Sequence, residues 1–119
     1  VGFDRYNMKF LQSWLKKEGF SEQELEDKFV EFGQGTASMT PALRELEVKL
    51  LTQTIKHGGN PVLNMCALNT RVVGESGARK FDKVKSRGRI DGMVALAMAV
   101  GVTVIEGVEE VREPTLFFV

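Results

Sequence analysis

Residues 80–92 combine a cluster of cations with one aspartate at the start of an apolar segment. The cations are Lys80, Lys83, Lys85, Arg87 and Arg89; Asp91 follows them, and residues 93–100 are all apolar. A helix that is apolar all round is normally buried, so Asp91 is expected where a core helix begins. Two interpretations fit it: an acid favoured by the positive end of the helix macrodipole, or a metal-binding carboxylate beside a groove for a phosphate backbone.

Asp4 is the second acid whose position suggests chemistry. Residues 1–3 predict the end of a short strand, and Asp4 stands where that strand stops. Functional acids of α/β proteins are often placed in the loops that follow strands. The alternative is that Asp4 caps the helix that follows it. The local sequence leaves both interpretations open.

The elements that must position these acids follow from periodicity and turn signals. Helices are predicted over 6–17 with Trp14 as a core anchor, from the capping box at Ser21 to about 28, from Thr40-Pro41 to near 56, over 62–68, and over 91–101. Strands are predicted at 29–32 and as a hairpin of 71–73 with 81–84, and residues 102–105 as a strand or extended tail. The chemistry-bearing acids therefore lie at the ends of predicted elements.

Two further residues are candidates for an accessory role. His57 lies in the tight connection 57–61, where a histidine more often caps a helix C-terminus than binds metal. Asp82 is close in sequence to Asp91, but pairing with Lys80 or Arg79 is the commoner role for such an acid. Neither alternative is decided by the sequence.

Composition limits the classes of protein that fit. The 119 residues suffice for one domain with a core; 43% are hydrophobic, and no apolar run approaches the length of a membrane span. The net charge is zero, yet residues 70–91 carry seven basic and three acidic side chains between flanks of −1 and −3. Such a local excess suggests one contact with a polyanion. A single cysteine, Cys66, excludes an internal disulfide and disfavours a structural zinc site, and a cytoplasmic setting is expected.

Three segments form a series in a fixed order. The first is Gly2-Phe3-Asp4-Arg5-Tyr6; the second runs from 30–35 through 38–42 to His57-Gly58-Gly59-Asn60-Pro61 and on to Asn69; the third is Asp82-Lys83, Gly88-Arg89-Ile90-Asp91-Gly92 and 95–99. In order and spacing this series resembles the carboxy-terminal part of the nuclease domain of tailed-phage terminase large subunits, the DNA-packaging motor proteins. Met65 stands where an aromatic residue is expected, and no resemblance is assigned to residues 102–119.

The resemblance implies an α/β fold of the RNase H-like class, with helices on both sides of a mixed sheet. It implies a metal-dependent endonuclease that cleaves double-stranded DNA, with two Mg²⁺ or Mn²⁺ ions about 4 Å apart. Asp4 matches the middle acid of the family's metal set and Asp91 the final one. The five cations named above would then contact the DNA backbone. In the longer protein the partners would be the terminase small subunit and the portal, in the host bacterial cytoplasm.

One departure limits this expectation. The family's first acid lies on a strand upstream of residue 1, and the turn 74–77 is not a P-loop. The chain is therefore expected to be a partial nuclease domain over 1–101, with 102–119 a tail of the same domain or an oligomer contact. An opened sheet edge would favour pairing with a second copy. The alternatives are a non-catalytic DNA-binding or assembly fragment, such as a prophage remnant, and another RNase H-like nuclease such as a junction resolvase.

Overall fold

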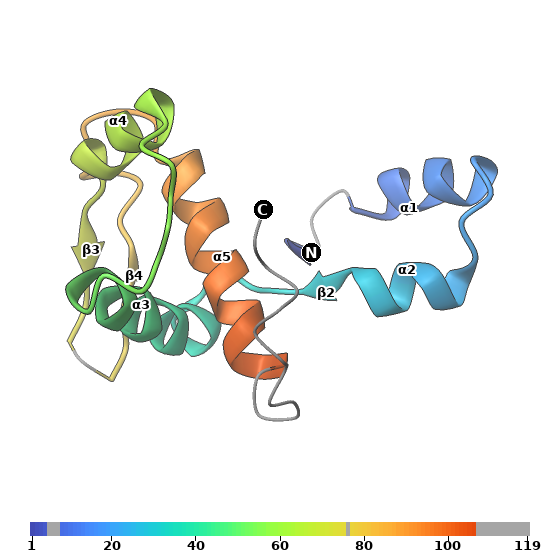
Figure 1. Ribbon diagram of the computed structural model, residues 1–119, viewed down its shortest axis with the longest axis horizontal. Coiled ribbons are helices and arrows are strands. Elements are labelled where there is room, and N and C mark those ends of the chain that lie inside the picture. Colours follow the sequence, from blue (N-terminus) through green and yellow to red (C-terminus); the bar gives the residue numbers. More distant parts are fainter. Residues whose placement is uncertain (5–7, 76, 107–119) are drawn as a thin grey trace.

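Two long helices, α3 (Thr36–Leu51) and α5 (Asp91–Glu106), pack together at the centre of the fold (Figure 1). The computed structural model describes residues 1–4, 8–75 and 77–106. The remaining elements are β1 (Gly2–Phe3), α1 (Met8–Lys17), α2 (Glu22–Lys28), β2 (Val30–Glu31), α4 (Pro61–Asn69), β3 (Val72–Val73) and β4 (Lys80–Phe81). No helix in these ranges is long and apolar enough to cross a bilayer.

The core forms where small and flexible side chains let α3 and α5 approach closely. Met39 and Ala42 from α3 are 1% and 0% exposed, and Ala97 from α5 is 0% exposed. Phe32, which follows β2, and Phe81 on β4 join the same cluster. The expectation that the apolar segment after Asp91 is a buried helix is therefore confirmed.

The strands form two separate pairs among the described residues. β1 and β2 are parallel, with Gly2 opposite Val30, and β3 and β4 are antiparallel, with Val72 opposite Phe81. The predicted hairpin is thus confirmed, with shorter strands. The described part of the chain shows these two pairs in place of one mixed sheet.

Helix α5 runs past Gly101 to Glu106, so the expectation that the helix ends at Gly101 and gives way to an extended segment is wrong. Gly101 is buried, and a Cβ there would lie 2.4 Å from the Phe32 ring and 2.9 Å from the Ala42 Cβ. The glycine permits close helix packing and does not end the helix. The part of the predicted tail beyond residue 106 lies outside the described residues.

Helix α3 begins at Thr36 with Gly35 as its N-cap, so the expected start at Thr40-Pro41 is also wrong. Thr40 is buried, and its hydroxyl accepts a hydrogen bond from the Arg79 N–H at 2.8 Å. A tertiary contact therefore uses the side chain that the sequence suggested as a cap. The helix also ends earlier than expected, at Leu51.

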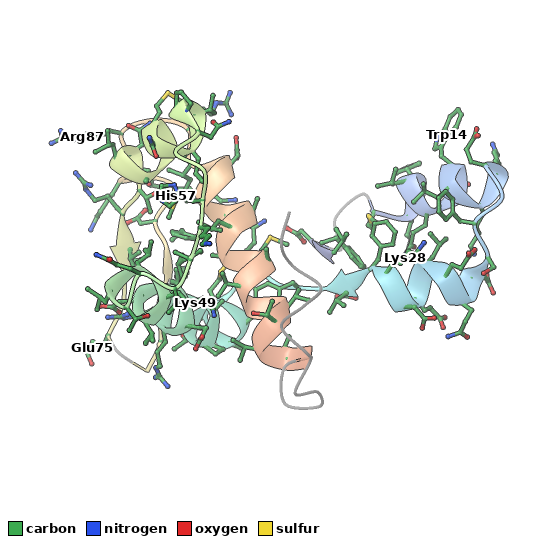
Figure 2. The ribbon with its side chains drawn as sticks, in the orientation of Figure 1. Trp14, Lys28, Lys49, His57, Glu75 and Arg87 are labelled. Carbon is green, nitrogen blue, oxygen red and sulfur yellow. The ribbon has the colours of Figure 1, made fainter. Side chains whose placement is uncertain are left out.

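Helices α1 and α2 extend away from the α3–α5 pair (Figure 1). The capping box that begins α2 is confirmed: the Glu24 N–H donates to the Ser21 hydroxyl, and the Ser21 N–H donates to the Glu24 carboxylate. Trp14 is 64% exposed and points away from α2 (Figure 2), with the Lys17 ammonium 5.0 Å from its ring. The prediction that Trp14 anchors the core is therefore wrong.

Candidate functional site

Asp4 follows β1 directly, as the sequence predicts. Its half-buried carboxylate accepts a hydrogen bond from Gln34 Nε2 at 2.8 Å. Gln34 lies just beyond β2, and because β1 and β2 are parallel, their C-terminal ends bring these side chains together. The alternative role of Asp4 as a helix cap involves residues 5–7, which lie outside the described ranges.

Gln34 connects Asp4 to an open pocket of about 490 Å³. The pocket is lined by Gln34, Met39, Val73, Lys80, Phe81, Asp82, Lys83 and Val84. Three of the predicted site residues, Lys80, Asp82 and Lys83, therefore lie around one pocket, and the hydrogen-bond partner of Asp4 forms part of its wall. Gln34 itself was missed by the sequence reasoning, although its place between two glycines after a strand is typical of a functional loop.

Asp91 is the first residue of α5 and is exposed. The helix starts there because the N–H groups of Met93 and Val94 donate to the Ile90 carbonyl. Helix α4 packs against this end, since a Cβ on Gly92 would lie 3.3 Å from the Cys66 sulfur. The position fits both interpretations of Asp91, as an acid at a helix N-terminus and as an accessible carboxylate ligand.

Asp4 follows the C-terminal end of β1, whereas Asp91 is at the N-terminal end of α5. A Cβ on Gly2 would lie 2.8 Å from Val102 and 3.4 Å from the Met98 carbonyl oxygen, so β1 packs against the C-terminal half of α5. Asp91 is seven residues before Met98, or about 10 Å along the helix axis. A metal ion shared by Asp4 and Asp91 therefore stays a prediction.

The donor chemistry of the two aspartates fits a hard divalent ion, because Mg²⁺ and Mn²⁺ prefer carboxylate oxygens. Within the described ranges, however, no group of three or more His, Cys, Asp or Glu side chains is placed to hold a metal ion. Asp4 and Asp91 are thus suitable ligands by type, and the described residues do not assemble a full ligand set around them.

The five predicted DNA-contacting cations are all exposed. Lys80 is on β4, and the other four lie on the loop of residues 82–90 that joins β4 to α5. Lys80 and Lys83 line the pocket, whereas Arg87 lies at the outer edge of the molecule beside α4 (Figure 2). Arg79 is not part of this set, because its guanidinium pairs with Glu47 at 2.8 Å.

The two accessory candidates have local roles. The Asp82 carboxylate accepts hydrogen bonds from the N–H groups of Val84 and Lys85, so the expected pairing with Lys80 or Arg79 is not observed. His57 is exposed, and its Nδ1 accepts from the Gly59 N–H at 3.1 Å. It therefore stabilises its own turn. The expected cap on the C-terminus of α3 is not observed. Whether either side chain takes part in the site stays a prediction.

Comparison with known proteins assigns the chain to a class. Residues 1–106 match the family model described as the terminase large subunit, endonuclease domain. The chain therefore belongs to the terminase large subunit endonuclease domain family. The resemblance found in the sequence is confirmed, and it extends beyond Gly101 to residue 106.

A solved structure and two curated proteins show which members of the family are similar. The crystal structure of the HK97 bacteriophage large terminase matches with a TM-score of 0.73 and 44% identity over 85% of this chain and 20% of that chain. This match confirms the RNase H-like fold. The large terminase subunit of Enterobacteria phage HK97 is 55% identical over 73 residues, which is 60% of this chain and 14% of that protein. Protein YmfN of Escherichia coli (strain K12) is 37% identical over 73 residues, 57% of this chain and 16% of that protein. The chain thus spans a fifth or less of the length of these relatives.

Proposed function

We propose that this chain is the DNA-cleaving part of a phage packaging protein, a metal-dependent endonuclease domain that acts on double-stranded DNA. The observation that carries the proposal is the position of Asp91: in a domain of the terminase endonuclease family, it opens the buried helix α5 directly after a loop of exposed cations. This arrangement puts an accessible carboxylate next to a surface suited to a phosphate backbone.

In this proposal Asp4 and Asp91 hold Mg²⁺ or Mn²⁺. When bound, two such ions activate a water and stabilise the leaving oxygen of phosphodiester hydrolysis. The protein's own contribution is positional: Gln34 orients the Asp4 carboxylate through its hydrogen bond of 2.8 Å. Because phosphate contacts carry no sequence information, cleavage by this domain has no strong sequence preference.

The exposed cations hold the DNA in this proposal. Lys80 and Lys83 lie at the pocket beside Gln34, so they contact the backbone closest to Asp4. Lys85, Arg87 and Arg89 continue this contact along the loop toward Asp91. In this proposal the DNA backbone follows the loop from the pocket beside Gln34 toward Asp91.

The cellular setting is also part of the proposal. The longer protein works with the terminase small subunit and the portal in the bacterial cytoplasm, and this domain is able to self-associate. In this proposal the nuclease domain reaches at least residue 106, where α5 and the family match both end, and the residues beyond it belong to the same domain or to an oligomer contact.

The test is the substitution Asp91→Ala in the longer protein that carries this domain. Cleavage of linear double-stranded DNA in Mn²⁺ should fall by more than the roughly 10–100-fold that is typical when a residue supporting a metal ligand is lost. The thermal unfolding midpoint should change little, because Asp91 is exposed. Asp27→Ala, on the exposed side of α2, is the matched control and should cut normally. Cleavage of DNA by the Asp91 variant at the rate of the parent protein would refute the proposal.

A second candidate is a non-catalytic DNA-binding or assembly fragment, such as a prophage remnant. It is favoured by the five exposed cations, which can bind DNA without a metal ion. DNA binding that depends on salt, but is indifferent to Asp91→Ala and to Mg²⁺, would support this alternative.

A further inference from the structure

The loop that carries four of the five cations is held at its beginning by the side chain of Asp82. Its Oδ1 accepts hydrogen bonds from the N–H groups of Val84 and Lys85, both at 3.0 Å. The Asp82 carbonyl oxygen also accepts from the N–H and the hydroxyl of Ser86. An aspartate that binds the amides two and three residues ahead fixes a local turn, and an asparagine can do the same.

The end of the loop is held by Asn69, the last residue of α4. Its carbonyl oxygen accepts from the Arg87 N–H at 3.3 Å, and its side-chain Nδ2 donates to the Arg89 carbonyl oxygen at 3.3 Å. A Cβ on Gly88 would lie 2.8 Å from that Nδ2, so only glycine leaves room for the contact. Because α4 packs against α5, these contacts tie the end of the loop to the body of the domain.

We propose that Asp82 is a positioning residue for DNA: its carboxylate fixes the turn that presents the loop's cations to the backbone. The inference rests on the proposed DNA contact and deepens it. A loop that is already ordered does not need to be ordered when DNA binds, so the turn lowers the cost of binding. This role also accounts for an acid at a surface that attracts phosphate, where its charge alone works against binding.

The sign of the effect separates this role from simple electrostatics. If only charge mattered, replacing Asp82 by a neutral residue would strengthen DNA binding, because one repulsion between the acid and the phosphates is removed. If Asp82 holds the turn, Asp82→Ala weakens binding despite the lost repulsion. Asp82→Asn keeps the acceptor oxygen and removes the charge, so it should bind as tightly as the parent chain or more tightly.

The binding experiment uses fluorescence anisotropy with a labelled DNA duplex, at fixed salt and with EDTA to exclude metal ions. Asp82→Ala should weaken binding about fivefold, which is the change typical of a lost capping side chain. Asp82→Asn should stay within about twofold of the parent or bind more tightly. Glu75→Ala is the matched control: it removes an exposed acid at the opposite end of the β3–β4 hairpin from Arg87 (Figure 2), and its binding should not weaken. Unchanged or tighter binding by Asp82→Ala, or equal losses in the Ala and Asn variants, would overturn the inference.

A second measurement without DNA keeps this inference separate from the proposed function. Trypsin cleaves after lysine and arginine, and the loop holds four exposed sites, at Lys83, Lys85, Arg87 and Arg89. Asp82→Ala should be cut there faster than the parent chain, and Asp82→Asn at the parent rate. If Asp82→Ala is cut faster but none of the proteins binds DNA, the proposed DNA contact is refuted. The role of Asp82 in holding the turn still stands in that case. Equal cleavage of all three proteins would refute the role of Asp82 in the turn.

Discussion

The substitution Gly101→Ala tests the packing that the structure shows at the centre of the domain. The added Cβ would lie 2.4 and 2.5 Å from two carbons of the Phe32 ring, where nonbonded carbons normally stay about 3.5–4.0 Å apart. A second obstacle is Ala42 on α3, whose Cβ would be 2.9 Å away. Phe32 is 2% exposed and Ala42 0% exposed, so neither can move toward solvent without disturbing the core.

The expected magnitude follows from two opposing terms. Forcing an extra methyl group into a packed core typically costs about 1–3 kcal/mol. Alanine in place of glycine inside a helix returns about 1 kcal/mol through helix propensity. Because rigid groups block the Cβ on two sides, the cost should lie in the upper part of its range, and the net loss of unfolding free energy should be about 1–2 kcal/mol. For a chain of 119 residues this lowers the melting temperature by about 4–8 °C.

The assay is urea unfolding followed by circular dichroism, with a double-mutant cycle. Phe32→Leu removes the ring that blocks the Cβ, so Gly101→Ala should cost less in that background than in the parent chain. Gly92→Ala, near the start of the same helix, is the control, because its Cβ would meet only side-chain atoms at 3.3 Å or more. A Gly101 variant as stable as the parent, or one whose loss does not depend on residue 32, would refute the continuous packing of α5 against Phe32.

Two further predictions concern binding and pH. If all five cations contact the backbone, the logarithm of the DNA-binding constant should fall against the logarithm of salt concentration with a slope of about −4.5, and Lys85→Ala should reduce that slope by about 1. Lys28→Ala, on α2 and far from the loop (Figure 2), should leave the slope unchanged; equal effects of the two variants would contradict the proposed DNA surface. The N–H and hydroxyl of Ser21 hold the pKa of the Glu24 carboxyl below its usual value. The stabilisation from this lowered pKa is complete above about pH 4.3 and is lost as the pH falls through the lower pKa of the folded state. Ser21→Ala should therefore reduce the helicity measured by circular dichroism at pH 7, and less helicity should be lost on acidification. An unchanged dependence of helicity on acid pH would contradict this role.

Local signals predicted much of the fold correctly. The capping box at Ser21 needs only residues three positions apart, and the antiparallel pair β3–β4 needs only two short strands around a turn. The long apolar run after Asp91 predicted a buried helix for the same reason. These features depend on residues close together in the sequence, so they can be recognised without knowing the tertiary structure.

The errors share a physical cause, which is that tertiary contacts determine what a residue does. Gly101 carries the usual signal of a helix end, but its role is to let Phe32 approach. Thr40 before a proline has the usual form of a cap, yet its hydroxyl is used by the Arg79 backbone. Trp14 has the helical spacing of a core residue but is exposed and points away from α2 (Figure 2). No local pattern contains the partner that decides these cases.

The candidate site shows the same division. The positions of Asp4 and Asp91 at the ends of a strand and of a loop were predicted, because each depends on the adjacent segment. The contact of Asp4 with Gln34, which is 30 residues away, could not be predicted from spacing. The turn held by Asp82 is a local feature, and an aspartate at the start of a loop is a usual signal for such a turn. That signal was overlooked because the charges of the segment suggested an ion pair for Asp82 instead.

The measurement that tests the proposed site most directly is a crystal structure of this chain after soaking in Mn²⁺. The anomalous signal of manganese locates any bound ions. We expect a peak contacted by carboxylate oxygens of both Asp4 and Asp91 at about 2.0–2.2 Å, and no peak between them in crystals of Asp91→Asn. Two carboxylates that stay apart, with no manganese at either one, would contradict the assignment of both residues as metal ligands.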